Sequence, residues 1–372
     1  MRRIGLAAAL LLATAAGCRV EHTSSAPIAT SSHGDAGPDA ARRVESHFVL
    51  AGGTVLGRGP ADVEVMDGKI VAVGSEAAPG VARIDVTGRF LAPSFIDSHV
   101  HLAYLPRAAD LARGGIAAAV DLAAPLRMLG AGSDPIEVLP SGPMLTAPGG
   151  YPTQGWGRDG YGREVANPAE ATAAVDELYR SGARVLKLAL AGEPALDLAT
   201  LQAAAERAHA LGMKVAAHAV SDAEARLAGD ASADVLAHTP VEPLSEPALS
   251  TWSKRVVIST LAAFGGEAAR QNLRELRRRG AKVLYGTDFG NVRTAGINVD
   301  EIAELLQAGL APSAVIDSAT REPAAYWGMS ELGEIVPGKG ASLLVLDRDP
   351  LADPSTLGRP VQVYLRGLPL AP

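Results

Sequence analysis

Cysteine is nearly absent from this sequence: Cys18 is the only one among its 372 residues. A lone cysteine has no partner within the chain, so no intramolecular disulfide is expected. Long basic runs are also missing, since Arg277–Arg279 is a short triplet at a predicted helix end and the net charge is −7. This balance argues against a nucleic-acid-binding surface.

The apolar run at the start of the chain, Ile4–Ala16, is too short to span a membrane. It follows Arg2 and Arg3 and ends in small residues, which is typical of a secretory signal peptide. The run closes on Ala-Ala-Gly-Cys18, which resembles a bacterial lipoprotein cleavage site. We therefore predict a lipoprotein-type signal peptide over 1–18 and a lipid anchor at Cys18, the alternative being an ordinary signal with an incidental thiol. Because Arg19 is not an Asp-type retention signal, we expect attachment to the outer membrane, facing the periplasm.

Residues 19–45 are rich in Ser, Ala, Gly, Asp and Pro and are predicted to be a flexible tether. The whole chain of 372 residues is 48% hydrophobic, and its length suits a large domain plus a small one. Strand patterns occur near both ends, including two strands around Asp67-Gly68, a strong hairpin signal. We predict that 46–92 and 329–372 pair into one small composite β domain.

The long middle segment, 93–328, alternates short apolar runs with helical stretches, which indicates repeated β-α units and a parallel sheet. Its length of roughly 235 residues is that of an eight-unit (β/α) barrel. The first expected strand ends at about residue 101. The others run over 116–122, 137–145, 185–190, 214–219, 235–238, 256–260 and 282–287. Predicted helices include 168–181, 198–211 and 268–279.

The first of these strands carries a metal-chelating pattern, because it ends in His99 and His101. Side chains two residues apart on a strand share a face, so both imidazoles point the same way. Imidazole binds zinc and related metals. Other polar residues close later strands of the same segment: Lys187, His218, His238 and Asp288. Since chemistry in such barrels sits at the carboxyl ends of strands, these residues are predicted to share one site.

Together these motifs resemble the amidohydrolase superfamily of metal-dependent hydrolases, within its prolidase-like and imidazolonepropionase-like branch. The resemblance covers about residues 46–370 and includes Gly286-Thr287-Asp288, Ala319-Thr320 and the closing motif 333–347. It implies a distorted (β/α)8 TIM barrel flanked by a small β-sandwich-like domain, an α/β fold overall.

The resemblance also implies roles for single residues. His99, His101 and Asp288 would hold one divalent metal, expected to be zinc, and His218 and His238 a second. Lys187, carboxylated by CO2 to a carbamate, would bridge the two. The metals would activate a bridging hydroxide, and Asp288 would serve as catalytic base together with the Lys187 bridge.

One departure concerns the substrate. Many prolidase-like relatives carry His after a Gly pair where this chain has Gly149-Gly150-Tyr151. The loop that follows is expected to line the pocket mouth, with Tyr151, Trp156 and Arg158 as candidate substrate contacts or an ordinary surface loop as the alternative.

Three functions follow from the sequence. The first is hydrolysis of an amide or peptide C–N bond in a small molecule, of the dipeptide, Xaa-Pro or N-acyl amino acid type. The second is a one-metal deaminase or cyclic-amide hydrolase that uses His99, His101, His218 and Asp288; Lys187 argues against it. The third is a surface lipoprotein that binds metal or a partner without catalysis, and a homo-oligomer is left open in each case.

Overall fold

Two mixed β layers, in which antiparallel and parallel pairs both occur, form the smaller part of the computed structural model, which describes residues 47–74, 80–130, 132 and 134–371. The signal peptide, the tether and Cys18 lie outside the described residues and stay predictions. All described residues belong to one unit, Val44–Pro372. Within them, no helix combines the length and the apolar character that a membrane crossing requires.

The first layer is a four-stranded sheet in the order β5-β4-β1-β6. Its strands are β1 (His47–Ala51), β4 (Val63–Met66), β5 (Lys69–Val73) and β6 (Ala82–Asp85). The predicted hairpin joins β4 to β5: Met66 pairs with Lys69, and both Asp67 and Gly68 have positive φ angles, of 49° and 78°. Two such residues form the turn whose twist matches that of the flanking strands.

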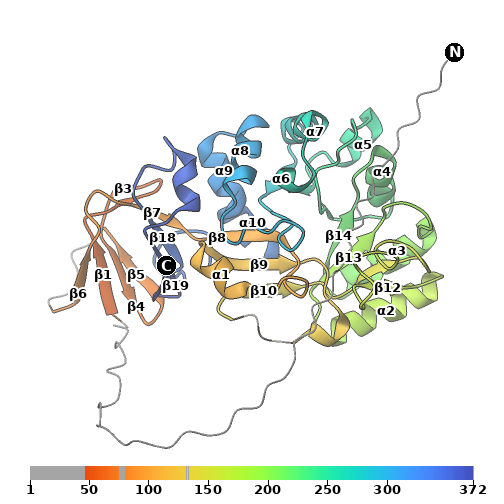
Figure 1. Ribbon diagram of the computed structural model, residues 1–372, viewed down its shortest axis with the longest axis horizontal. Helices are drawn as coiled ribbons and strands as arrows, with labels where there is room; N and C mark the ends of the chain where they lie inside the picture. The colour runs from red at the N-terminus through yellow and green to blue at the C-terminus, as the bar shows by residue number, and fades with distance from the viewer. Residues whose placement is uncertain (1–46, 75–79, 131, 133, 372) are drawn as a thin grey trace, which may run out of the picture. The chain divides into compact units, whose positions relative to one another are not determined.

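The second layer draws on both ends of the described chain. Its order is β20-β19-β18-β7-β2-β3. The strands are β2 (Thr54–Val55), β3 (Gly59–Pro60), β7 (Phe90–Pro93), β18 (Leu343–Leu346), β19 (Gln362–Leu365) and β20 (Leu368–Leu370). The sheet is continuous because β18 runs antiparallel to β7, and Figure 1 shows these early and late strands together. Phe48 of β1 stacks on Tyr364 of β19 at 5.5 Å, so the two layers share a core.

Parallel strands make up the larger part of the molecule. One sheet has the order β10-β9-β8 and the other β12-β11-β13-β14-β15-β16-β17. Their bounds are β8 (Phe95–Val100), β9 (Ile116–Asp121), β10 (Glu137–Pro140), β11 (Met144–Thr146), β12 (Gly162–Glu164), β13 (Val185–Ala189), β14 (Lys214–His218), β15 (Val235–Leu236), β16 (Val256–Ile258) and β17 (Lys282–Leu284).

Each strand predicted in the middle segment is present, with one correction. The strand expected over 137–145 is interrupted and forms β10 and β11. Between them Gly142 has a φ of 71°, and Pro143 has no backbone N–H to donate to a neighbouring strand. The sequence prediction joined the apolar residues on either side of this break, although Gly142-Pro143 is a pattern that interrupts strands.

Hydrogen bonds connect the two parallel sheets on two sides. On one side, Ser98 N–H donates to Tyr285 O and Asp288 N–H donates to His99 O, each at 2.9 Å. On the other side, Arg184 N–H donates to Pro140 O at 2.9 Å. This α/β arrangement of parallel strands is consistent with a TIM-barrel-like fold.

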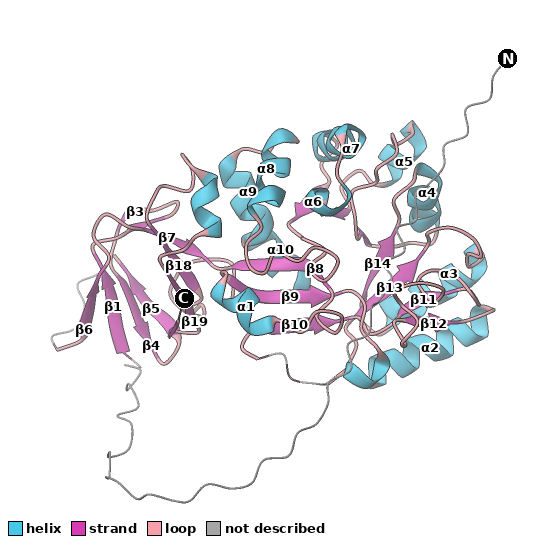
Figure 2. Cartoon of the chain, in the orientation of Figure 1, coloured by secondary structure: helices cyan, strands magenta, loops and turns pink. Residues whose placement is uncertain are grey.

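Helices accompany the parallel strands (Figure 2). They are α1 (Ala108–Arg113), α2 (Pro168–Arg180), α3 (Leu198–Ala210), α4 (Asp222–Asp230), α5 (Glu246–Thr251), α6 (Leu261–Phe264), α7 (Glu267–Arg278), α8 (Val299–Gln307), α9 (Pro312–Ala319) and α10 (Arg321–Trp327), with short 3-10 turns at Leu126–Met128 and Pro354–Gly358. Local sequence explains several starts: Asn167 and Asp197 cap α2 and α3, and Ser221 forms a capping box with Glu224.

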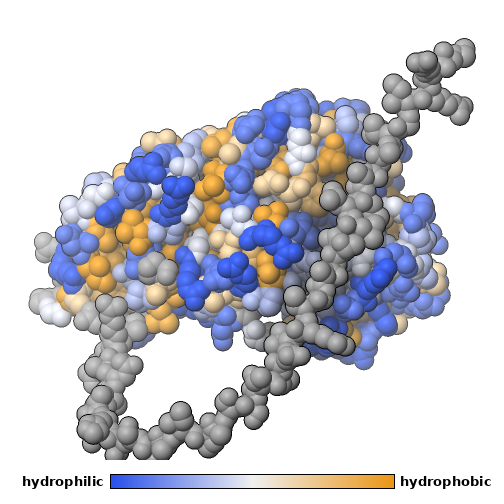
Figure 3. All heavy atoms as spheres, viewed as in Figure 1, coloured by the Kyte–Doolittle hydropathy of each residue, from blue (hydrophilic) through white to orange (hydrophobic). Residues whose placement is uncertain are grey.

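The helices bury one face each against the strands. In α2, for example, Val175 and Leu178 join the main core, while the opposite face is polar. On the visible surface, hydrophilic residues lie between hydrophobic ones, as expected for a face in water (Figure 3). Buried polar side chains, in contrast, gather at and near the carboxyl ends of the parallel strands.

Candidate metal centre

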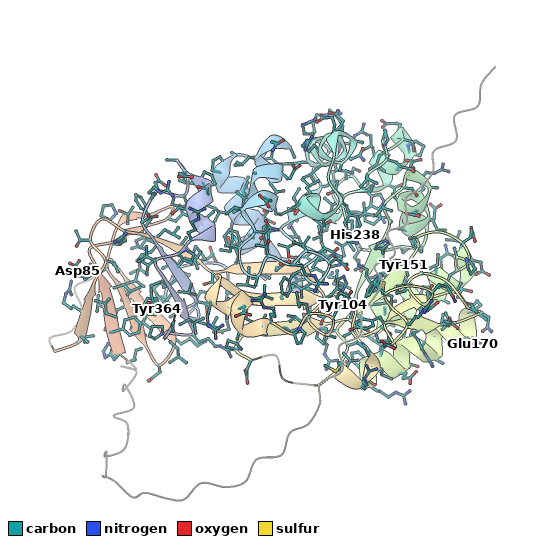
Figure 4. All side chains as sticks on the ribbon, in the orientation of Figure 1. Asp85, Tyr104, Tyr151, Glu170, His238 and Tyr364 are labelled. Carbon is teal, nitrogen blue, oxygen red and sulfur yellow. The ribbon has the colours of Figure 1, made fainter. Side chains whose placement is uncertain are left out.

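Six buried polar side chains come from five parallel strands; five of them lie at or beyond the carboxyl end of a strand, whereas Lys187, predicted to close a strand, lies in the middle of β13. His99 belongs to β8 and His101 follows it directly; Lys187 lies in β13, His218 ends β14, His238 follows β15 and Asp288 follows β17. All six are at most 5% exposed. Figure 4 labels His238 among these strand ends, with Tyr151 and Tyr104 in the same region. The structure therefore brings together every residue that the sequence predicted as a ligand.

His99, His101 and Asp288 form the tightest group, with ligand atoms all within 4.8 Å of one another. His101 Nε2 lies 2.9 Å from Asp288 Oδ1, and His99 Nε2 lies 3.4 Å from the same oxygen. Tetrahedral zinc with bonds of about 2.0–2.1 Å separates its ligand atoms by about 3.3 Å. The spacing of this trio thus fits a metal of that size.

Several polar atoms at the centre of the cluster have no hydrogen-bond partner among the described residues. They are His99 Nε2, Lys187 Nζ and Asp288 Oδ1, all buried. Buried polar atoms without partners are costly, and a cation between them would supply the missing interaction. Their arrangement therefore fits a divalent metal better than an ordinary polar core.

Hydrogen bonds on the far side of two imidazoles set which nitrogen faces this centre. The carbonyl of Ala237 lies 2.8 Å from His99 Nδ1, and a carbonyl can only accept, so Nδ1 carries the proton and Nε2 is left as a ligand. In His238, Nδ1 lies 3.0 Å from Thr260 Oγ1, and Nε2 lies 3.0 Å from His218 Nδ1. The last two atoms form a second pair of ligand positions.

Burial keeps the imidazoles in the form that binds metal. It lowers the pKa of His218 to about 3, and it holds the pKa values of His99 and His238 well below the ordinary range, with smaller contributions from neighbouring positive charges. Neutral imidazole is the ligand form. The metal-binding state is therefore populated near neutral pH.

Burial also changes the amine of Lys187. It lowers the pKa of this group to about 7, although the Asp288 carboxylate opposes the shift. In a substantial fraction of the molecules, Lys187 is then a neutral amine near pH 7. Neutral amines react with CO2, whereas protonated amines do not.

An aromatic rim, defined as Tyr104, Tyr151, Trp156 and Tyr161, covers the histidines. Tyr151 stacks on His218 with ring centroids 4.7 Å apart, and Trp156 lies 5.4 Å from the ring of His101. Trp156 Nε1–H donates to Tyr151 Oη at 3.1 Å. Tyr104 and Tyr161 contact Trp156 at 5.9 and 5.4 Å. Two predicted loop residues, Tyr151 and Trp156, thus lie at the site.

The third predicted loop residue is placed differently. Arg158 is exposed and donates to Gln154 O at 3.2 Å, and no recorded contact within the described residues joins it to the histidines. Sequence reasoning also missed Phe264, whose ring lies 4.4 Å from that of His238, and Thr260. A polar residue at the end of an expected strand was the available signal for Thr260. Phe264 offered none, because its helix is only one turn long.

Comparison with known proteins agrees with the family suggested by the motifs. Residues 253–368, which include Asp288, match the model of the amidohydrolase family. The N-acyl-D-aspartate deacylase of Alcaligenes xylosoxydans xylosoxydans is 51% identical over 63 residues, 15% of this chain and 13% of that protein. The adenine deaminase of Deinococcus deserti is 28% identical over 322 residues, 77% of this chain and 53% of that protein. The chain therefore spans about half the length or less of these curated relatives.

Solved structures share the fold. A Xaa-Pro dipeptidase with bound methionine superposes with a TM-score of 0.76 at 20% identity, covering 87% of this chain and 99% of that one. A prolidase from Bifidobacterium longum, described as putative, gives 0.74 at 22% identity over 88% and 95% of the two chains. The family and these relatives are hydrolases that act on carbon–nitrogen bonds, the enzyme class that the sequence predicts.

Proposed function

We propose that this chain is a metal-dependent amidohydrolase that cleaves an amide or peptide C–N bond in a small molecule. The observation that carries the proposal is the convergence of His99, His101, Lys187, His218, His238 and Asp288 in one buried cluster whose central atoms lack partners. We further propose the closed (β/α)8 barrel as its fold, and a lipid anchor at Cys18 on the periplasmic face of the outer membrane as its location.

Two metal positions follow from the donor atoms. His99, His101 and Asp288 would hold one divalent cation, and His218 Nδ1 with His238 Nε2 a second. Lys187, as a carbamate, would bridge them. When bound, the metals would polarise the scissile carbonyl and make hydroxide available near neutral pH. Zinc suits this set of imidazole and carboxylate ligands.

Asp288 would act as the proton carrier. Its carboxylate is buried, and Asn291 Nδ2 donates to Oδ2 at 3.0 Å, which leaves Oδ1 directed at the histidines. The backbone N–H of Asp288 donates to His99 O, which holds the Asp288 carboxylate beside the histidines where the nucleophilic water would bind. The carboxylate can take the proton of the nucleophilic water and deliver it to the leaving nitrogen.

The aromatic rim indicates which class of substrate the site favours. Its rings offer an apolar, planar surface beside His101 and His218, which favours dipeptides or N-acyl amino acids with an apolar or aromatic side chain. Arg293 places its guanidinium 5.5 Å from the ring of Tyr104, where it could attract a substrate carboxylate. The names of two similar proteins, a Xaa-Pro dipeptidase and an N-acyl-D-aspartate deacylase, support this bond type.

A second candidate is a one-metal deaminase or cyclic-amide hydrolase. It is favoured by the long stretch of similarity to adenine deaminase, 322 residues at 28% identity. Lys187 counts against it, because a fully buried lysine at the centre of the cluster has no role in a single site formed by His99, His101, His218 and Asp288.

Metal content tests the proposal against this alternative. Protein purified without chelators and with bicarbonate should hold two equivalents of metal per chain. Lys187→Ala should hold one or none, with kcat/KM lower by about 10²- to 10³-fold, because the bridge is lost. Lys214→Ala, which removes an exposed lysine from the neighbouring strand β14, is the matched control and should behave as wild type.

Other outcomes would redirect the proposal. One equivalent that Lys187→Ala leaves unchanged would favour the one-metal deaminase. A chain that binds no metal would contradict both enzymes and revive the non-catalytic binding protein.

A further inference from the structure

Thr260 has a backbone conformation that its side chain disfavours. It is fully buried, with φ 43° and ψ 33° in the left-handed region, directly before α6. A β-branched residue is an outlier there, because its Cβ crowds the backbone. Such strain persists only where the surroundings impose it, and it concentrates at functional sites.

The hydroxyl of Thr260 is not used in the ordinary way. A threonine before a helix normally has an extended backbone and accepts an N–H of the first turn through its side chain. Thr260 makes no such bond. Instead, Ala262 N–H donates to Glu301 Oε2 at 2.7 Å, so a carboxyl group from α8 satisfies the start of α6. The Thr260 hydroxyl is thereby free for another partner.

That partner is an imidazole of the metal centre. Thr260 Oγ1 lies 3.0 Å from His238 Nδ1, and the opposite nitrogen, Nε2, lies 3.0 Å from His218 Nδ1. A bond from Nδ1–H to a fixed oxygen leaves Nε2 unprotonated and sets the plane of the ring. His99 is held in the same way, but by the backbone carbonyl of Ala237. In His238, the equivalent oxygen is the side-chain hydroxyl of a strained residue, which accepts from Nδ1–H when Nε2 is the metal ligand.

We infer that Thr260 is a positioning residue for the second metal: its left-handed backbone aims the hydroxyl at His238 Nδ1, so that Nε2 faces the cation shared with His218. The inference rests on the proposed two-metal function and deepens it. The ligand is a divalent, imidazole-binding cation such as zinc. Glu301 caps α6 in place of Thr260, so the first turn of the helix does not lose its hydrogen-bond acceptor when the Thr260 hydroxyl contacts His238.

Zinc titration of the metal-free chain in bicarbonate, with a chromophoric chelator as competitor, tests the role. Wild type should bind two equivalents. Thr260→Ala should bind the second about 10- to 100-fold more weakly, because an outer partner of a metal-binding histidine has been removed. Thr260→Ser keeps the hydroxyl and should restore wild-type affinity.

Thr260→Gly separates the hydroxyl from the backbone. Glycine adopts a positive φ without strain, so this variant should have a higher melting temperature than Thr260→Ala in the metal-free state. It lacks the hydroxyl, so its second zinc should bind as weakly as in Thr260→Ala. It also keeps the test valid if Thr260→Ala folds poorly.

Three results would overturn the inference. Wild-type affinity for both equivalents in Thr260→Ala would show that the hydroxyl is not needed, and wild-type affinity in Thr260→Gly would reduce the role to the backbone. In both cases the two-metal proposal stands. A wild-type chain that binds one equivalent would overturn the two-metal proposal and this inference with it.

Discussion

Single residues around the candidate metal centre are placed against their ordinary preferences. Lys187 is fully buried without a hydrogen-bond partner among the described residues, and Thr260 has a left-handed backbone. Asp288 also has a positive φ, of 57°, which aspartate tolerates better than most residues. These departures cluster around one centre, whereas a stability-driven core would avoid them. At this scale the chemistry, not the packing, explains the residue types.

Trp156 offers a test of substrate choice at the residue scale. Trp156→Leu removes the ring beside His101 and the N–H donated to Tyr151. We expect kcat/KM for N-acetyl-phenylalanine to fall about 10-fold more than that for N-acetyl-alanine, because an apolar contact worth one or two methylenes is lost. Paired kinetics with both substrates measure this difference.

The control for this prediction is Trp156→Phe, which keeps an aromatic ring and should show a smaller change. Metal content should be unchanged in both variants. An equal loss of kcat/KM for the two substrates would mean that Trp156 shapes the site without contacting the side chain of the substrate.

Elements reach the site through close backbone contacts. A Cβ at Gly286, just after β17, would lie 2.3 Å from Ile258 Cγ2 and 3.1 Å from His99 Cβ, so only glycine lets β17 approach β16 and β8 there. Glu301 of α8 plays a similar connecting role, because it reaches across to the start of α6. The metal centre is thus held by contacts between neighbouring βα units.

Glu301 makes the stability of these elements depend on pH. Burial raises its pKa to about 7 from 4.5, against the hydrogen bond from Ala262. The folded chain therefore binds this proton more tightly than the unfolded chain does. The contribution of protonated Glu301 to the free energy of unfolding is fully present below about pH 4.5 and is lost as pH rises through 7. Glu301→Gln cannot ionise and should lack this loss.

Denaturant unfolding of the metal-free chain between pH 4.5 and 7.5 measures the effect. The free energy of unfolding of wild type, relative to Glu301→Gln, should fall by roughly 3 kcal/mol across that range. Asp300→Asn changes an exposed carboxyl on the same helix and serves as the control. A constant difference between wild type and Glu301→Gln at all pH values would contradict the prediction.

At the scale of the whole molecule, the candidate metal centre links strands that are far apart in sequence. His99 lies in β8 and Asp288 follows β17, and backbone hydrogen bonds between these two segments join the parallel sheets on one side; Lys187 lies in β13, which follows the bond from Arg184 to Pro140 on the other side. A bound cation would therefore connect segments on both sides at which the sheets join. Its free energy of binding adds to the stability of the whole fold.

Metal removal should accordingly lower global stability. With zinc at about 1,000 times its dissociation constant, binding contributes about 4 kcal/mol, and its removal by a chelator should lower Tm by about 5–10 °C. Calorimetry with and without chelator measures the shift, and excess zinc with bicarbonate should reverse it. Equal Tm values in both conditions would argue that no metal binds the folded state.

Much of the fold could be predicted because its signals are local. Apolar runs of strand length located the parallel strands except β12, whose sequence Gly-Arg-Glu is not apolar, and Asp67-Gly68 located a hairpin. The ligands were found for the same reason: a polar residue that closes an apolar strand stands out in sequence, and parallel strands bring such ends together.

The sequence by itself determined which residues meet at the strand ends; only the tertiary structure decided how they are oriented. The position of Arg158 away from the histidines and the ring of Phe264 against His238 left no pattern to recognise, whereas the break between β10 and β11 is marked by Gly142-Pro143. The bond between Thr260 and His238 joins residues 22 apart, and the cap that Glu301 places on Ala262 joins residues 39 apart. Orientation depends on such contacts between separate elements, because a side chain's rotamer and tautomer are set by the groups packed around it and not by its neighbours in the chain.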